Sequence, residues 1–402
     1  MSDTPSCQPE AVLAALAAAS GREPAFMHLL VADRCNHFCQ HCYQVHGLKG
    51  EMSFEEISKL LRSFSDAGGF VVSISGGEPT LRPDLVDILE RARELGLATV
   101  LYTNAFLVDD QLALRLAGAR VWRVEVSLYS DVAAEHDAVT RVPGSWERTL
   151  GGIRRLRSAG LNVRIKYTVT RESTATHDRL VTLAQQLDCA LLLADHVLAG
   201  EAGELASTRA RQEPRIVAER QRRDEGTALL SAGPCSIGTS LAVRSDGILQ
   251  PCTNVAVEMG RVGVDSDLIA VHRSSEVARF FRSLTWAHLH GCRDCDLRTV
   301  CSHCFASAAT EAGDLLAPYR AACELAVARH ALQRKGAEIL PAAPGCGCAR
   351  DPAVGPYRVE SNGMLRPVPD VLAQDDEQLV ARFPWIRPTR AALEAAALAR
   401  RR

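Results

Sequence analysis

The chain has 402 residues, 47% of them hydrophobic, and a formal net charge of -2 at pH 7. This composition is typical of a folded protein with a substantial core, large enough for two domains or for one barrel with an appendage. The lack of a positive excess argues against nucleic acid as the main partner, because a surface that binds nucleic acid has to neutralise phosphates. There is no apolar run of membrane-spanning length and no basic leader before an apolar segment, so we expect a cytoplasmic protein that does not associate with a membrane.

Apolar, β-branched runs alternate with amphipathic stretches between residues 25 and 200. The runs are FMHLLVA, GFVVSIS, LATVLYTN, RVWRVEVSL, LNVRIKYTV and CALLLAD, beginning at residues 26, 69, 97, 120, 161 and 189. The amphipathic stretches DLVDILERARELG and TLGGIRRLRSAG end at Gly96 and Gly160, where a helix C-cap glycine is expected. The pattern predicts an α/β fold with six strand-helix units, arranged as a parallel sheet or a partial (β/α)6 TIM-like barrel. Functional sites in such folds lie at the carboxyl ends of the strands.

Three cysteines follow the first predicted strand, in the stretch DRCNHFCQHCYQ at residues 33–44. Cys35, Cys39 and Cys42 are separated by three residues and then by two. A structural zinc site needs four ligands, and His37, His41 or His46 are available as the fourth. A four-iron cluster held by only three thiolates instead leaves one iron open to another ligand.

A glycine-rich turn, SISGGEPTLRPD at residues 73–84, follows the second predicted strand. Gly76 and Gly77 would let the backbone approach a ligand closely, and Glu78 adds an acceptor for a cationic group. Alone, such a turn is more typical of a tight strand-to-helix connection. Its place beside the cysteine triplet favours a ligand site.

Polar residues alternate with apolar ones in the fourth and fifth predicted strands. The alternation directs Glu125 and Lys166 into the barrel lumen, where we expect them to contact a substrate or to form internal ion pairs. Arg123 and Arg164 face the same way and either bind a ligand or satisfy other lumen groups. Ser127, at the carboxyl end of its strand, is the better candidate for a ligand contact.

Fourteen cysteines without a secretion signal indicate metal or redox sites, because disulfides are rare in the cytosol. We expect an N-terminal helical extension over residues 1–24, the partial barrel over 25–200, a linker over 201–232, a cysteine-rich domain over 233–330, and a tail with a terminal helix over 331–402. The cysteine-rich segment contains Cys235, Cys252, Cys292, Cys295, Cys301, Cys304 and Cys323.

The cysteine triplet and the Gly-Gly-Glu-Pro turn, in this order after successive strands, resemble those of radical S-adenosylmethionine (SAM) enzymes. The resemblance implies a four-iron four-sulfur cluster on Cys35, Cys39 and Cys42, with SAM bound to the open iron. Reduction of the cluster would cleave SAM to a 5'-deoxyadenosyl radical that removes a hydrogen atom from the substrate. Further SAM contacts implied by the resemblance are His41, Gly76, Gly77, Glu78, Pro79, Ser127, Arg141 and Leu193.

The second cysteine group resembles the auxiliary-cluster domain called SPASM, with one residue fewer before Cys304 than in its usual spacing. By analogy, Cys235, Cys252 and Cys304 would hold a first auxiliary four-iron cluster. The second would be held by Cys292, Cys295, Cys301 and Cys323. The first lacks a fourth cysteine, so it is either open to substrate or closed by another residue such as Cys189, Cys346 or Cys348. A pair of zinc ribbons is the alternative, because CxxC pairs also bind zinc.

SPASM domains favour an enzyme that oxidises or crosslinks a ribosomally synthesised peptide, working alone or with a separate leader-binding protein. A flavodoxin or ferredoxin would supply the electrons. The alternatives are a dehydrogenase or epimerase of a carbohydrate or antibiotic intermediate, and a non-catalytic iron-sulfur electron carrier. An electron carrier would not need the SAM-binding motifs.

Overall fold

The computed structural model describes residues 25–333 and the short strands at 357–359 and 365–367. Within 25–333 the description omits residues 48, 172–176, 195–196, 201–204, 224–234, 236, 239, 256 and 264–266. The expected N-terminal extension, the two ends of the expected linker and nearly all of the expected tail, including Cys346 and Cys348, therefore lie outside the described residues.

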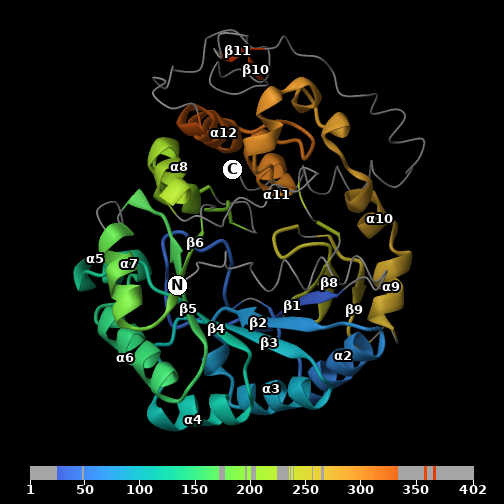
Figure 1. Ribbon diagram of the computed structural model, residues 1–402. Coiled ribbons are helices and arrows are strands. Elements are labelled where there is room, and N and C mark those ends of the chain that lie inside the picture. The colour runs from blue at the N-terminus through green and yellow to red at the C-terminus, as the bar shows by residue number, and fades with distance from the viewer. Residues whose placement is uncertain are drawn as a thin grey trace, which may run out of the picture.

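Six consecutive parallel strands form the centre of the molecule, in the order β6-β5-β4-β3-β2-β1. This confirms the predicted α/β class, and an open sheet of sequential strands is consistent with a partial barrel (Figure 1). Each strand lies within one of the six predicted apolar runs, or extends one residue past it in the case of β2. The strands are β1 (Phe26–Ala32), β2 (Val71–Gly76), β3 (Ala98–Thr103), β4 (Arg123–Ser127), β5 (Val163–Thr168) and β6 (Ala190–Ala194).

Helices that connect these strands form an outer layer along one face of the sheet (Figure 1). The first begins with a capping box, in which the backbone N–H of Ser53 donates to Glu56 at 2.8 Å and the Glu56 N–H donates to the Ser53 hydroxyl. The helices are α2 (Phe54–Asp66), α3 (Leu85–Glu94), α4 (Asp110–Gly118), α5 (Ala133–Thr140), α6 (Ser145–Ser158) and α7 (His177–Gln186), and a 3-10 turn η1 (Pro79–Leu81) follows β2.

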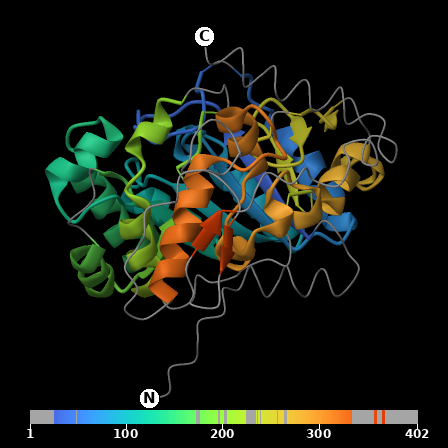
Figure 2. The ribbon, with the colours of Figure 1, turned by 90° about the horizontal axis from the view of Figure 1, so that it is seen from above.

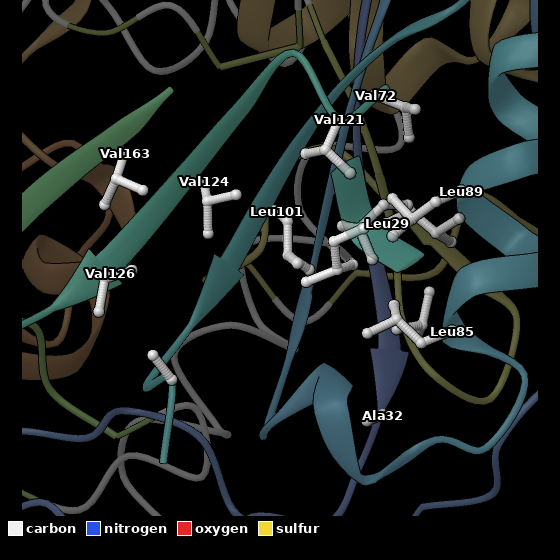
Figure 3. Packing of buried hydrophobic residues seen from close by; sticks show 14 of the residues in the cluster. Leu29, Ala32, Val72, Leu85, Leu89, Leu101, Val121, Val124, Val126 and Val163 are labelled. Carbon is white, nitrogen blue, oxygen red and sulfur yellow. The ribbon is translucent and has the colours of Figure 1, made fainter. Parts of the chain in front are cut away.

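The main hydrophobic core lies between the sheet and this helical layer. Figure 3 shows Leu29, Leu101 and Val124 on the strands together with Leu85 and Leu89 of α3. All five are essentially inaccessible to solvent. Because side chains alternate along a strand, burial of this face directs the intervening residues to the opposite face, which is the lumen.

The C-terminal cysteine-rich region joins the sheet through β7 (Leu241–Val243), which pairs in parallel with β1. Two antiparallel strands, β8 (Ile248–Gln250) and β9 (Gly260–Arg261), extend this edge. Figures 1 and 2 show the first of the following helices, in yellow, at the edge of the sheet beside α2, and the orange helices lying over the sheet. The helices of the cysteine-rich region are α9 (Leu268–Ser274), α10 (Glu276–Ser283), α11 (Phe305–Ser307), the π-helical turn η7 (Ala308–Ala312) and α12 (Arg320–Gln333). Three 3-10 turns lie between α10 and α11, namely η4 (Trp286–His288), η5 (Cys292–Asp294) and η6 (Asp296–Val300).

The segment between the barrel and this region contains the 3-10 turn η3 (Ser207–Ala210) and α8 (Pro214–Arg223). Helix α8 packs against α12, so the segment after the last barrel strand contacts the end of the cysteine-rich region. A separate pair of antiparallel strands is formed by β10 (Tyr357–Val359) and β11 (Leu365–Pro367). None of the helices within the described ranges combines the length and apolarity needed to cross a bilayer.

Candidate functional site

The cysteine triplet lies in a loop that leaves β1 at its carboxyl end and folds back on itself. The Asp33 carboxylate accepts the Lys49 N–H at 2.6 Å, and its carbonyl accepts the Gly47 N–H at 3.2 Å. Arg34 donates twice to the Glu51 carboxylate, each time at 3.1 Å. These bonds join the two ends of the loop, so the three thiols are held in a short closed segment.

The thiols of Cys35, Cys39 and Cys42 are half-buried and close enough to influence one another. Burial raises the pKa of the Cys35 thiol to about 11 and that of the Cys39 thiol to about 12, and the neighbouring Cys42 contributes to both shifts. Deprotonating all three in the absence of a cation is therefore unfavourable. The loop also rests on α5, because the N–H groups of Phe38 and Gln40 donate to the last carbonyls of that helix at 3.0 Å.

The two glycines after β2 lie directly against the cysteine loop. A Cβ atom on Gly76, where φ is +135°, would lie 2.3 Å from the Ala32 carbonyl oxygen. A Cβ atom on Gly77 would lie 2.1 Å from the Arg34 carbonyl oxygen and 3.1 Å from the Cys35 Cβ. No side chain fits at either position, so glycine allows the two loops to come into backbone contact.

Glu78 is buried and connects the loops that follow β2 and β3 at this end of the sheet. One carboxylate oxygen accepts the hydroxyls of Thr80 and Thr103, each at 2.6 Å, and the other accepts the Asn104 N–H at 2.7 Å. Burial raises the pKa of Glu78, and these hydrogen bonds oppose that effect. Most of the hydrogen-bonding capacity of the carboxylate is thus used within the protein, which makes Glu78 a group that fixes the loops in place.

His41 faces the end of β4. Its ring contacts the Tyr129 ring edge-on with centroids 4.8 Å apart, and burial together with Lys166 lowers the His41 pKa to about 4. The Tyr129 hydroxyl lies beside both the Cys39 thiol and the Ser127 hydroxyl. Tyr129 therefore links the cysteine loop to the predicted ligand contact at Ser127.

The lumen face of β4 and β5 carries a group of buried charges. Glu125 lies between two arginines, with Arg123 Nε at 2.8 Å and Arg164 Nη2 at 2.6 Å from its Oε1 atom. The Lys166 ammonium lies 5.0 Å from the centre of the Tyr102 ring, over its face. Glu125 and Lys166 were both expected to contact a substrate or to form internal ion pairs. The structure shows Glu125 in internal ion pairs, and Lys166 lies nearer the open end of the lumen.

Two of the predicted SAM contacts, Arg141 and Leu193, do not lie on the lumen face of the strands. Arg141 follows α5 in the left-handed conformation, with φ of +57°, and its side chain is exposed beside the point where the cysteine loop rests on that helix. Leu193 pairs in register with Tyr167 and is buried in the core beneath the helices. The structure therefore does not bring Leu193 to the lumen face, and Leu192 occupies that face instead.

The C-terminal cysteines form two neighbouring groups. Burial raises the pKa of Cys252, and the adjacent Cys304 raises it further. Burial likewise raises the pKa of Cys301 to about 12, with a contribution from Cys295. Each pair lies within one of the predicted ligand sets, whereas Cys301 and Cys304, which were predicted in different sets, pack against the same small cluster.

Other cysteines differ in their relation to these groups. Cys235 packs near Cys252 and Cys292 around a small hydrophobic cluster. Cys189 lies at the amino end of β6 in the main core, at the opposite end of the sheet from the cysteine loop, so it is not placed to complete either set. In the part of the chain that the structure describes, no three His, Cys, Asp or Glu side chains converge as ligands of a single metal ion.

Residues 29–181 match the model of the radical SAM superfamily. These residues form a radical SAM domain. The family binds SAM and a four-iron four-sulfur cluster, and the donors present in this radical SAM domain fit both. The cationic irons would stabilise the three cysteines as thiolates, which otherwise repel one another, and the glycine backbone next to them is free of side chains.

Relatives of the radical SAM domain act on different substrates. The AdoMet-dependent heme synthase of Nitratidesulfovibrio vulgaris is 27% identical over 329 residues, which are 71% of this chain and 89% of that synthase. The mycofactocin maturase MftC of Mycobacterium tuberculosis is 31% identical over 160 residues, 39% of this chain and 41% of MftC. The solved structure of Streptococcus suis SuiB bound to its precursor peptide SuiA has a TM-score of 0.58 at 18% identity, covering 74% of this chain and 76% of SuiB.

Three residues around the radical SAM domain were not singled out from the sequence. Tyr129 lies among Cys39, Ser127 and His41, and Asn104 donates its backbone N–H to Glu78 and its side-chain amide to Asn36 in the cysteine loop. Tyr43 lies close to both Cys42 and Cys252 and interacts with Thr253, so it connects the two cysteine-rich parts of the protein. The positions of Tyr129 and Asn104 just after strands were the available signal, because ligand sites gather at carboxyl ends.

Proposed function

We propose that the protein is a radical SAM oxidoreductase in which Cys35, Cys39 and Cys42 hold the SAM-binding cluster. The observation that carries this proposal is the backbone contact between the cysteine loop and Gly77 at the open end of a charged lumen. When bound, the cluster and SAM supply a 5'-deoxyadenosyl radical that removes a hydrogen atom from a substrate. A flavodoxin or ferredoxin is the proposed electron donor.

The residues around this site orient the cofactor. Gly76, Gly77 and Pro79 shape the turn on which the SAM amino group is bound, and Glu78 keeps that turn against the β3 loop. Ser127 and Arg141 are proposed to bind the ribose and carboxylate, since both lie where the cysteine loop meets β4 and α5. His41 is neutral at pH 7 and contributes a flat, half-buried surface for the adenine.

We also propose two auxiliary four-iron clusters in a SPASM domain over residues 233–330. Cys235, Cys252 and Cys304 would hold the first and Cys292, Cys295, Cys301 and Cys323 the second. The proximity of Cys252 to Cys304 and of Cys295 to Cys301 supports this division. The radical SAM domain would cover residues 25–200 and the linker residues 201–232.

The proposed substrate is a ribosomally synthesised peptide, which would be oxidised or crosslinked. The match to MftC and the common fold with the peptide-bound SuiB support this choice. A second candidate is a side chain of a tetrapyrrole. It is favoured by the match to the heme synthase of N. vulgaris, which extends over 71% of the chain rather than over one part of it.

Anaerobic reconstitution tests the chemistry. The wild-type protein should bind about twelve irons and cleave SAM to 5'-deoxyadenosine on reduction. Replacing Cys35, Cys39 and Cys42 together by Ala should abolish cleavage and leave about eight irons. Cys189→Ala is the matched control and should keep all the iron, because Cys189 lies in the core at the far end of the sheet. Stoichiometric zinc without SAM cleavage would exclude the proposal.

The substrate class is tested separately with the same preparation. One arm offers a precursor peptide encoded beside the gene, and the other offers iron coproporphyrin III. Mass spectrometry should find a loss of hydrogen or a new crosslink in the peptide if the first candidate is right. A change of mass in the porphyrin alone would support the second candidate and rule out the first.

A further inference from the structure

Lys166 lies at the level where the lumen becomes accessible. It pairs in register with Ser127 on β4 and Leu192 on β6, and all three residues are partly exposed. The next lumen-facing residues toward the amino ends, Glu125 and Arg164, are buried. The side chains of β4 and β5 therefore form a closed floor of charges with the Lys166 side chain above it.

The floor is built around one carboxylate, Glu125, which lies between two arginines. Glu125 is the carboxylate paired with Arg123 and Arg164, and it also faces Lys166, whose pKa is lowered by burial and raised in part by Glu125. Both Glu125 oxygens are engaged by arginine, since Arg164 Nε also donates to Oε2 at 2.9 Å. Within the described part of the chain the Lys166 ammonium makes no hydrogen bond or ion pair, and its close contact is the Tyr102 ring.

The nearby histidines do not supply a negative charge, because an imidazole is either neutral or cationic. His28 on β1 shares a hydrogen bond with the Ser73 hydroxyl at 2.9 Å, and its ring lies near enough to Lys166 to respond to its charge. His41 packs edge-on against Tyr129 and responds to Lys166 in the same way. Neither ring therefore supplies an anionic partner for the Lys166 ammonium beside the cysteine loop.

We propose that a carboxylate of the substrate binds to the Lys166 ammonium, with Arg164 and Arg123 held beneath it by Glu125. This inference rests on the proposed function, because it identifies a chemical group of the substrate for the same site. A carboxylate would supply the ion-pair partner that the Lys166 ammonium does not have among the described residues, and burial strengthens this attraction. Peptides carry such a group at the C-terminus or on acidic side chains, and coproporphyrin carries it on its propionates.

The scarcity of lysine makes this contact measurable. The chain has four lysines, at positions 49, 59, 166 and 335, so acetylation of each can be followed by mass spectrometry. The anaerobic holoprotein is treated with an acetylating reagent in the presence of propionate or, at equal ionic strength, of propionamide with sodium chloride. Propionate at about ten times its Kd should slow acetylation of Lys166 roughly tenfold, and propionamide should not. Lys59 is the internal control, since it is exposed and paired with Glu55.

Two further arms distinguish the sources of the carboxylate. Iron coproporphyrin III is compared with its tetramethyl ester, and a neighbouring precursor peptide with free carboxylates is compared with the same peptide after esterification. Protection of Lys166 by the free acid and not by the ester supports the proposal and identifies the source. Equal protection by acid and ester in both arms, or no protection by propionate, overturns it.

Variants separate this inference from the proposed function. Lys166→Met should weaken binding of the protecting acid about 30-fold or more, and Lys166→Arg should recover part of the loss. Lys59→Met should change nothing. SAM cleavage without substrate is measured in the wild type and in Lys59→Met. Its absence in the wild type would count against the radical function and not against the carboxylate contact. Unchanged acid binding in Lys166→Met would refute the carboxylate contact alone.

Discussion

The Glu78 carboxylate accepts the backbone N–H of Asn104 at 2.7 Å, and this bond joins the loops that follow β2 and β3. Asn104 in turn donates from its side chain to Asn36, which lies between Cys35 and Cys39, at 2.7 Å. The glycine turn, the β3 loop and the cysteine loop are thus connected through two residues. Disturbing either residue should affect the cysteine site without direct contact with a thiol.

Glu78→Gln should destabilise the protein by about 1–3 kcal/mol and weaken SAM binding. The new amide group would face N–H and hydroxyl donors that now bind a carboxylate, leaving at least one buried donor unsatisfied. Thermal unfolding and calorimetric titration with SAM measure the two effects. Glu55→Gln is the control, because Glu55 is exposed and should change neither quantity by much. Wild-type SAM affinity in Glu78→Gln would contradict the positioning role.

Gly77→Ala should prevent the cysteine loop from holding its cluster. The new Cβ would lie 2.1 Å from the Arg34 carbonyl oxygen, so one of the two loops has to move. Iron content after anaerobic reconstitution should fall by about four per chain, the complement of one cubane cluster. Gly118→Ala is the control, since that glycine ends α4 and an added Cβ there would meet no atom within 4 Å. Its iron content should stay at the wild-type value.

Glu125→Gln should cost about 3–5 kcal/mol of folding stability, because it removes the negative charge between two buried arginines. Substrate turnover should fall as well, while SAM cleavage without substrate continues. Urea unfolding of the apoprotein gives the stability change. A stability within about 0.5 kcal/mol of the wild type would show that solvent or another group already compensates the arginines.

Local patterns were sufficient to predict the six strands, the cysteine loop and the glycine turn. Each of these is encoded by adjacent residues, through alternation, spacing or backbone freedom. The face of Leu193 was not predictable in this way, because CALLLAD is apolar on both faces and carries no polar residue to mark the lumen before its last position. Tyr129 and Asn104 are marked in the sequence only by their positions just after strands, and Tyr43 has no local mark, because the contacts of all three come from loops that are distant in sequence.

Acid should destabilise the fold through its buried histidines, of which His272 is one. Burial lowers the His272 pKa from 6.5 to about 4, so between these values the unfolded state binds a proton that the folded state does not. Stability is therefore fully present above about pH 6.5 and is lost as the pH falls toward 4, by up to about 1.4 kcal/mol per pH unit for this group. His272→Phe should flatten the pH dependence of urea unfolding by one proton equivalent. An unchanged slope would show that His272 is already charged in the folded state.

The Arg211–Glu311 ion pair should hold the segment after β6 against the cysteine-rich region. Arg211 donates from both terminal nitrogens to Glu311 at 2.7 Å, and Glu311 lies in the π-helical turn beside a cavity of about 340 Å3 that is also lined by Tyr319. The pair is partly exposed, so solvent screens it, and Glu311→Gln should cost about 1–3 kcal/mol. Hydrogen exchange should rise in residues 308–323 in this variant. Glu324→Gln, in the exposed Arg320–Glu324 pair on α12, should change exchange there by much less. If both variants behave alike, the bidentate pair is a surface contact and the two regions are held together by the packing of α8 against α12.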